Sequence, residues 1–156
     1  MKARVIDIDK GYNNLFKLNK INPSGVDIGV FSSAKNKEKS VAEYAIENEY
    51  GVPSKNVPPR PFMRSTFDQN VDKIEDMIKV FVKAFIKRSI SERDFFKTVG
   101  SMLQDKIKLR ITDSKSWAIA NKASTVARKK GGDTPLIDTG RLRQSITYKT
   151  TTGSTK

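Results

Sequence analysis

The stretch PLIDTGRLRQSITY, residues 135–148, carries three local structural signals in immediate succession. Asp138 and Thr139 can cap a helical turn, and Gly140 permits the tight backbone that such a turn needs. The residues from Ser145 to Tyr148 are rich in side chains that favour strands. The segment therefore predicts a turn, a short helical element and a strand, which is the mixture expected of an α+β chain.

The spacing of apolar residues predicts further strands and a helix in the N-terminal part of the chain. Residues 26–31 alternate as a half-buried strand does, with Val26, Ile28 and Val30 on one face. Residues 3–9 are predicted to form a strand and residues 12–21 a helix, which ends at the Pro-Ser-Gly sequence that follows. The polar segment 34–39 is predicted to be a loop. We expect a small, mostly antiparallel sheet.

A helix over residues 41–50 has a defined start and a defined end in the sequence. Ser40 and Glu43 form a capping box, and Gly51 supplies a C-terminal stop. The following arm, residues 52–64, contains four prolines, which hold the backbone extended and remove amide donors. We therefore expect the arm to be neither helix nor central strand. It serves either as a rigid connector or as a pre-extended segment that delivers Phe62 and Met63 to a neighbouring subunit.

Two long amphipathic helices are predicted in the middle of the chain. Apolar residues recur every three or four positions from Asp68 to about Lys87, and again after a second cap at Ser91 and Asp94. The short connection between them predicts an antiparallel pair, packed together or on the sheet. Residues 113–134 are polar apart from Trp117, and we expect them to be flexible until a neighbour orders them.

Composition predicts one domain over residues 1–150, followed by a flexible tail over 151–156. The chain has 156 residues, of which 37% are apolar and 30% charged, so the core should be small. The N-terminus lacks the apolar run of a signal peptide, and no apolar stretch approaches the roughly 20 residues that span a bilayer. These features predict a soluble protein, made in the cytoplasm, that does not engage membranes.

Two residue types that are common in catalytic sites are absent from the sequence, which leaves carboxylate-only chemistry, to which nothing in the sequence points. The sequence has no cysteine and no histidine, which removes disulfides, thiolate nucleophiles, the common zinc ligands and the usual general base near neutral pH. Glu47 and Glu49 are two positions apart on a helix and so point to different faces. Gly131-Gly132-Asp133 lacks the Gly-Lys-Ser/Thr continuation of a phosphate loop. We expect no enzyme activity, no metal and no cofactor.

A formal net charge of +13 raises the possibility of nucleic-acid binding. The densest basic cluster is Arg128, Lys129 and Lys130, which are candidates for contact with phosphate. Arg141 and Arg143 could grip a carboxylate or phosphate, or pair within the chain with Asp138, Glu47 or Glu49. No aromatic residues are interleaved with these cations, and no DNA-reading motif is present. The charge suits an acidic protein partner equally well.

Two segments together resemble a known family. They are ENEYG, residues 47–51, continuing into VPPRPFMR, residues 57–64, and LIDTGRLRQSI, residues 136–146. Their order, with two amphipathic helices between them, resembles the tail-completion and virion-morphogenesis proteins of tailed bacteriophages, which include relatives of the Mu-type G protein and the lambda-type minor tail protein Z. The resemblance covers residues 25–150. A histidine usual in the family before the aromatic-glycine helix end is replaced here by Asn48.

The resemblance implies a small α+β structural protein of the virion, assembled in the host bacterial cytoplasm. It would act as a neck or tail-completion subunit at the head–tail junction, in a ring taken as hexameric. Its partners would be the connector, the tail terminator or the tail tube, with double-stranded DNA passing through the channel without sequence readout. The residues expected at subunit interfaces are Arg60, Phe62, Met63, Arg64, Trp117, Arg141 and Arg143.

Two alternative functions follow from the same features. A tail terminator, which caps the tail tube, is also a small ring-forming subunit with extended loops, and the sequence does not separate it from a neck protein. A basic DNA-binding accessory protein would instead use its exposed cations on phosphate, and its binding would fall steeply with salt.

Overall fold

The structure, a computed structural model, describes residues 25–31, 40–87, 89–130 and 132–151. These residues form an α+β fold with a small antiparallel sheet and several helices, as predicted. The predictions for residues 3–9, 12–21, 34–39 and 152–156 lie outside this range. In chain order the elements are β1 (Gly25–Val30), α2 (Val41–Tyr50), the 3-10 turn η1 (Pro53–Lys55), α3 (Phe62–Asp68), α4 (Val71–Ile86), α5 (Glu92–Thr112), α6 (Ser114–Trp117), α7 (Ala123–Val126), α8 (Arg141–Ser145) and β2 (Ile146–Thr151).

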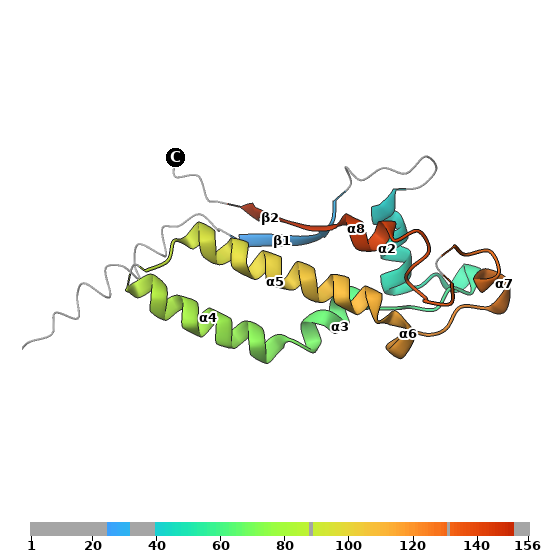
Figure 1. Cartoon of the computed structure of the whole chain (residues 1–156), viewed down its shortest axis with the longest axis horizontal. Coiled ribbons are helices and arrows are strands. Elements are labelled where there is room, and N and C mark those ends of the chain that lie inside the picture. The colour runs from blue at the N-terminus through green and yellow to red at the C-terminus, as the bar shows by residue number, and fades with distance from the viewer. Residues whose placement is uncertain (1–24, 32–39, 88, 131, 152–156) are drawn as a thin grey trace, which may run out of the picture.

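The sheet joins the two ends of the described chain. β1 and β2 pair antiparallel, with Ile28 opposite Tyr148 and Val30 opposite Ile146. Both strands lie on α5, and α4 runs along the other side of α5 (Figure 1). The predicted antiparallel helix pair is present, but packing of the sheet against both helices is not confirmed, because α5 lies between the sheet and α4.

A glycine allows β2 to approach α5 closely. A Cβ atom at Gly100 would lie 2.4 Å from Cδ2 of Tyr148, which is far inside van der Waals contact. Near the end of the same interface, the side-chain amide of Gln104 donates a hydrogen bond to the carbonyl of Ile146 (3.1 Å). The sheet is therefore seated on the middle of α5 by a contact that any larger side chain would disturb.

The caps of α2 agree with the sequence prediction. The amide of Glu43 donates to Ser40 Oγ (3.2 Å), and the amide of Ser40 donates to the Glu43 carboxylate (3.1 Å), which completes the capping box. Gly51 follows the helix with φ of 75°, a conformation that favours glycine. Local sequence alone was sufficient to predict both ends of this helix.

The proline-rich arm differs from the prediction in its last residues. It begins with a tight turn closed by a bridge between Val52 and Val57, continues as extended chain, and becomes helical at Phe62. Residues 62–64 are thus the first turn of α3, which corrects the expectation that the whole arm is non-helical. Proline precedes this turn at position 61, and the amides of Met63 and Arg64 find an acceptor in Glu49.

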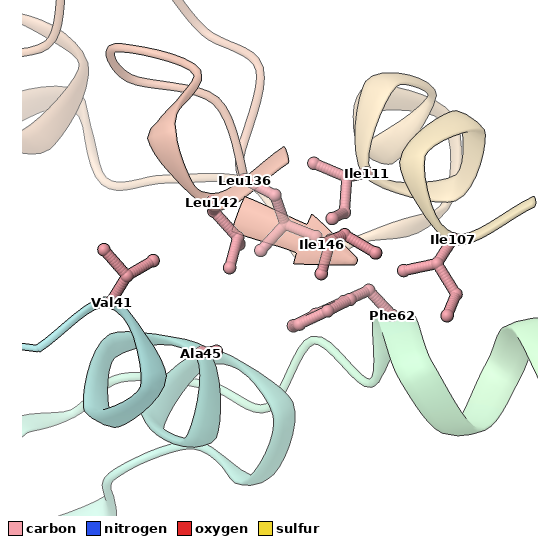
Figure 2. Packing of buried hydrophobic residues seen from close by; sticks show 8 residues of the cluster. All are labelled: Val41, Ala45, Phe62, Ile107, Ile111, Leu136, Leu142 and Ile146. Atoms are coloured by element: carbon pink, nitrogen blue, oxygen red, sulfur yellow. The ribbon is translucent and has the colours of Figure 1, made fainter. Parts of the chain in front are cut away.

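The core lies where α2, α3, α8 and the C-terminal half of α5 meet (Figure 2). Its buried side chains come from every one of these elements, from β2 and from the loop before α8. They are Val41, Ala45, Phe62, Ile107, Ile111, Leu136, Leu142 and Ile146. Segments far apart in sequence therefore share one cluster.

The polar stretch after α5 has a defined path, in contrast to the prediction that it stays flexible without a neighbour. It forms α6 and α7 and is bonded to its own chain. The indole N–H of Trp117 donates to the Arg110 carbonyl (2.9 Å), and the Arg110 guanidinium lies over the indole ring at 4.0 Å. Polar groups of a single chain bond to one another in this part of the segment.

Candidate functional site

The two segments that carry the family resemblance lie against each other at one end of the molecule. Phe62 of the first segment and Leu136, Leu142 and Ile146 of the second are members of the same buried cluster. A hollow of about 210 Å³ lies between the start of α2 and the loop before α8; it is lined by Ser40, Val41, Tyr44, Leu136, Asp138, Thr139, Gly140, Arg141 and Leu142. The tertiary fold therefore makes one structural unit of two separate sequence signals.

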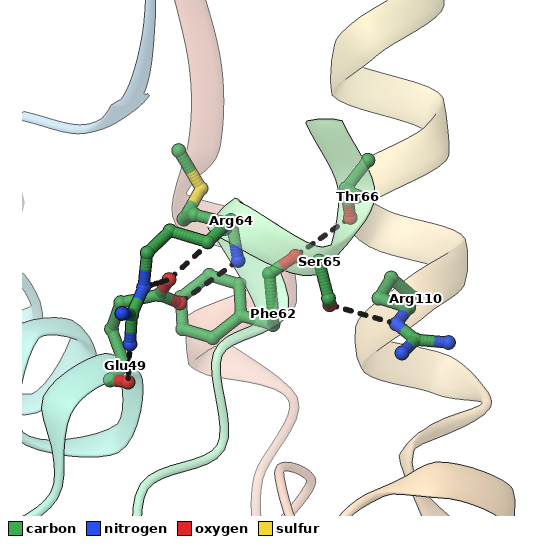
Figure 3. Close-up of polar contacts among 7 residues, drawn as sticks. Glu49, Phe62, Arg64, Ser65, Thr66 and Arg110 are labelled. Atoms are coloured by element: carbon green, nitrogen blue, oxygen red, sulfur yellow. Dashed lines mark hydrogen bonds and ion pairs between the residues drawn. The ribbon is translucent and has the colours of Figure 1, made fainter. Parts of the chain in front are cut away.

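Glu49 joins the C-terminal turn of α2 to the start of α3 (Figure 3). The residue is only 5% exposed, and its side-chain oxygens accept hydrogen bonds from the amides of Met63 (2.8 Å) and Arg64 (3.0 Å). Arg64 Nε adds a third bond at 3.1 Å, and Arg64 Nη2 donates to the Glu49 carbonyl at 3.0 Å. A carboxylate facing free amides at a helix N-terminus is favoured by the helix dipole. Glu49 is therefore a positioning group that fixes the angle between the two helices.

Glu47 faces away from Glu49, as their spacing predicts. It lies 3.5 Å from Lys55 in the turn that follows α2. The two carboxylates therefore contact different groups, which include the α3 amides for Glu49 and Lys55 for Glu47.

Arg60 is buried, with 6% of its surface exposed, and is bonded to the loop after α6. Its Nε donates to the Ile119 carbonyl (2.8 Å), and Nη2 donates to Asn121 Oδ1 (3.0 Å). Burial lowers the pKa of Arg60 from its usual value, and the nearby Tyr44 opposes that shift. The backbone amide of Arg60 donates to the carbonyl of Asn48 (2.6 Å). The arm is thus fastened to α2 on one side and to the polar loop on the other.

The remaining residues predicted at subunit interfaces divide between the interior and the surface. Phe62 is 1% exposed inside its own core, so in this fold the ring is not displayed to a neighbour. Met63 packs partly buried against the core, and Trp117 is also partly buried. Arg64 remains on the surface, with its guanidinium 4.7 Å from the centroid of the Tyr50 ring. The role of the latter three residues between subunits stays a prediction.

Arg141 and Arg143 are exposed on α8. Of the acidic partners considered for them, Glu49 is bonded to Arg64, and Asp138 accepts a hydrogen bond from the amide of Lys130 (2.7 Å). Their proposed contact with a carboxylate or phosphate of another molecule stays a prediction.

The three adjacent cations at 128–130 do not present a continuous basic surface. The ammonium of Lys129 turns back to donate to the carbonyls of Thr134 and Pro135. Burial is the main cause that lowers the pKa of Lys129, and Arg60 lowers it further. Arg128 Nε donates to the Ser124 carbonyl (3.1 Å), and Lys130 is exposed. Arg128 and Lys130 are thus the exposed cations of this cluster, and Lys129 is partly buried.

The part of the chain that the structure describes holds no group of three or more acidic side chains arranged to bind a metal ion. Within the same residues, no helix has the length and apolarity needed to cross a bilayer. Every buried side-chain nitrogen or oxygen in that part of the chain has a hydrogen-bond partner.

The sequence did not predict several features, including the following two. One is the bonding of Glu49 across α2 and α3, for which the sequence held no signal beyond an acidic residue before a helix start. The other is an exposed apolar stripe on α4, which a close reading could have found, because the apolar arc of that helix is wider than a single neighbour covers.

In comparisons with known proteins, no family model, no curated protein and no solved structure matches the chain.

Proposed function

We propose that this chain is a structural virion protein of a tailed bacteriophage, acting at the head–tail junction as a ring-forming neck or tail-completion subunit. The observation that carries the proposal is the convergence of the two family-like segments, residues 47–64 and 136–146, on one buried cluster. Both segments contribute side chains to this cluster, Phe62 from the first and Leu136, Leu142 and Ile146 from the second. A single structural unit with both segments as parts would bring them together.

The polar chemistry of this end supports a scaffolding role. Glu49 and Arg60, its buried charged residues, are bonded to the backbone of the same chain. Charged groups used in this way hold elements at fixed angles and are not available to a substrate. The mechanism we propose is accordingly geometric: a rigid subunit presents one face to its neighbours and other faces to the head and the tail.

An apolar patch on the outer side of α2 is the surface that we expect to meet a neighbouring subunit. Ile46 and Tyr50 are one helical turn apart and are among the most exposed large apolar side chains of the described residues. Arg64 lies over the Tyr50 ring and adds a guanidinium to the same patch. Aromatic and arginine side chains of this kind are enriched at protein interfaces. The proposed ring is hexameric and contacts the connector, the tail terminator or the tail tube.

DNA passes through the channel of the proposed ring without sequence readout. A lumen crowded with lysine and arginine would hold the passing DNA too tightly, so we place most of the positive charge outside the channel. An assembled ring with residues 128–130 lining the lumen would contradict this placement.

A tail terminator remains the second candidate, because it requires the same kind of subunit. A DNA-binding accessory protein is the third, supported only by the exposure of Arg128 and Lys130 and by the net charge of +13. That third function predicts binding that weakens steeply with salt and needs no oligomer.

The test is electron microscopy of lysates from a phage that carries a nonsense codon early in this gene. Filled heads beside separate tails of normal length would support a completion role, and tails of uncontrolled length would favour the terminator. Normally joined, infectious particles would refute the structural role. Complementation should succeed with the wild-type gene and with Lys55→Ser, and should fail with the double substitution Ile46→Ser and Tyr50→Ser, which changes only exposed side chains.

A further inference from the structure

Helix α4 has two apolar faces, of which one is covered. On the inner face, the Phe81 ring stacks on Phe95 of α5 with centroids 3.4 Å apart. On the outer face, Val71, Ile78, Val82 and Ile86 follow one another at intervals of seven, four and four residues. This spacing places them in a single stripe along the helix. Each is between 42% and 55% exposed, so α5 leaves the stripe uncovered.

The charges beside this stripe are segregated along the helix. The acidic residues Asp72, Glu75 and Asp76 occupy the first half, whereas Lys79 and Lys83 occupy the second; Lys73 is the one cation in the acidic half. Three acids and three lysines make α4 neutral, in a chain whose formal net charge is +13. A neutral face is where a second strongly cationic copy can approach with the least repulsion.

We propose that α4 is a self-association surface, on which α4 of a second copy packs antiparallel about a two-fold axis near Ile78. In that arrangement Val71 of one copy meets Ile86 of the other, and the acidic half of each helix lies along the basic half of its partner. Asp72 comes beside Lys83 of the second copy. Asp76, which lies 3.1 Å from Lys79 of its own helix, also comes beside Lys79 of the second copy. A two-fold contact of this kind uses the same patch on both subunits, and it requires this self-complementary charge order.

Other occupants fit the face less well. DNA and acidic proteins are attracted by excess positive charge, which α4 lacks and which other parts of the chain supply. In a parallel pair of α4 helices, the acidic halves would face each other and so would the basic halves, which is unfavourable. The apolar stripe supplies the attraction in the antiparallel pair, and the charges set its direction.

The first test is sedimentation equilibrium of the full chain and two single variants. Val82→Glu places a charge within the stripe and should weaken dimerisation by at least about tenfold. Val80→Glu is the matched control, because Val80 is 66% exposed and lies two residues from both Ile78 and Val82, roughly 200° around the helix. It should leave dimerisation unchanged. A wild-type chain that stays monomeric at high micromolar concentration, or equal effects of the two variants, would overturn the proposal.

Charge reversal tests the register. Asp72→Lys with Asp76→Lys should weaken the dimer about tenfold, and adding Lys79→Glu with Lys83→Glu in the same chain should restore it to within about threefold of wild type. Absence of restoration in a chain with normal helical circular dichroism would contradict the antiparallel charge pairing.

Disulfide trapping tests the direction without relying on any charged variant. The native sequence has no cysteine, so each introduced thiol is unique. Mixing the Val71→Cys chain with the Ile86→Cys chain under copper-phenanthroline oxidation should give a cross-linked heterodimer. Either chain alone should not cross-link, because the two copies of each residue would lie roughly 22 Å apart along the helix axis. Efficient cross-linking of each chain to itself would refute the antiparallel arrangement. The outcome is independent of the head–tail proposal, which rests on other residues.

Discussion

Helices α4 and α5 run side by side and are both amphipathic, yet they contribute differently to the fold. α5 buries Val99, Gly100, Leu103, Ile107 and Ile111, whereas α4 has no buried residue. The difference arises because α5 has the sheet on one side and α4 and α3 on another, whereas α4 rests on α5 (Figure 1). A helical apolar stripe therefore predicts a helix, and the number of neighbours decides how much of the stripe is buried.

The largest effect expected from this contrast concerns two phenylalanines. Phe62→Ala should lower the free energy of unfolding by about 3–5 kcal/mol, because the ring is fully enclosed and its removal leaves a cavity. Phe85→Ala on α4 removes a ring that is only partly buried, and should cost about 1 kcal/mol. Urea denaturation of both variants measures the difference. Equal losses would show that α4 is as firmly packed as the core.

A second comparison concerns two carboxylates of α2, Glu49, which is buried, and Glu47, which is nearer the surface. Glu49→Gln replaces one carboxylate oxygen by an NH₂ group that cannot accept a bond from the amides of α3, and we expect a loss of about 2 kcal/mol. Glu47→Gln on the same helix weakens a surface pair with Lys55 and should cost less than about 0.5 kcal/mol. Thermal unfolding followed by circular dichroism checks both. A harmless Glu49→Gln would mean that its bonds do not hold α3 in place.

Gly100 lies in the part of α5 that carries the sheet. Gly100→Ala should destabilise the chain by about 1.5 kcal/mol, since the new Cβ would lie 2.4 Å from the Tyr148 ring and must displace it. In an open helical site the same change would instead be stabilising by about 1 kcal/mol. Combining it with Tyr148→Ser should recover part of the loss. A stabilising Gly100→Ala in chemical denaturation would show that the sheet does not press on α5 at this point.

The smallest expected effect is a loss of stability at alkaline pH that depends on Tyr44 in α2. Burial is the main cause that raises the pKa of the Tyr44 hydroxyl above its ordinary value of 10.0, and the charge of Asp138 adds to the shift. The neutral phenol thus favours the folded state. Its contribution is complete below pH 10.0 and is lost as the pH rises through the folded-state value. As the pH rises above 10.0, wild type should lose more thermal stability than Tyr44→Phe. Parallel losses in the two proteins would contradict this effect.

Features that depend on residues close together in the sequence were predictable from the sequence. The capping box of Ser40 and Glu43 and the cap of α5 at Ser91 each depend on contacts within a few positions. The strand predicted over residues 26–31 is present as β1 (Gly25–Val30), but only Asp27 in it is exposed, so its burial does not alternate as predicted. The helical start at Phe62 was missed because it depends on Glu49, thirteen residues earlier, which accepts the first free amides of α3. The defined path of the loop after α6 was missed for a similar reason, since Arg60 bonds it from 59 residues away.

By itself, the sequence determined an α+β chain with two long amphipathic helices, a proline-rich arm and no histidine or cysteine. Tertiary structure decided that Phe62 belongs to the core, that Lys129 turns inward, and that half of the apolar arc of α4 remains on the surface. Helix and turn preferences act over a few residues, whereas burial depends on which distant elements cover a side chain. Both proposals concern surfaces that the folded chain leaves uncovered, the outer side of α2 and the outer stripe of α4.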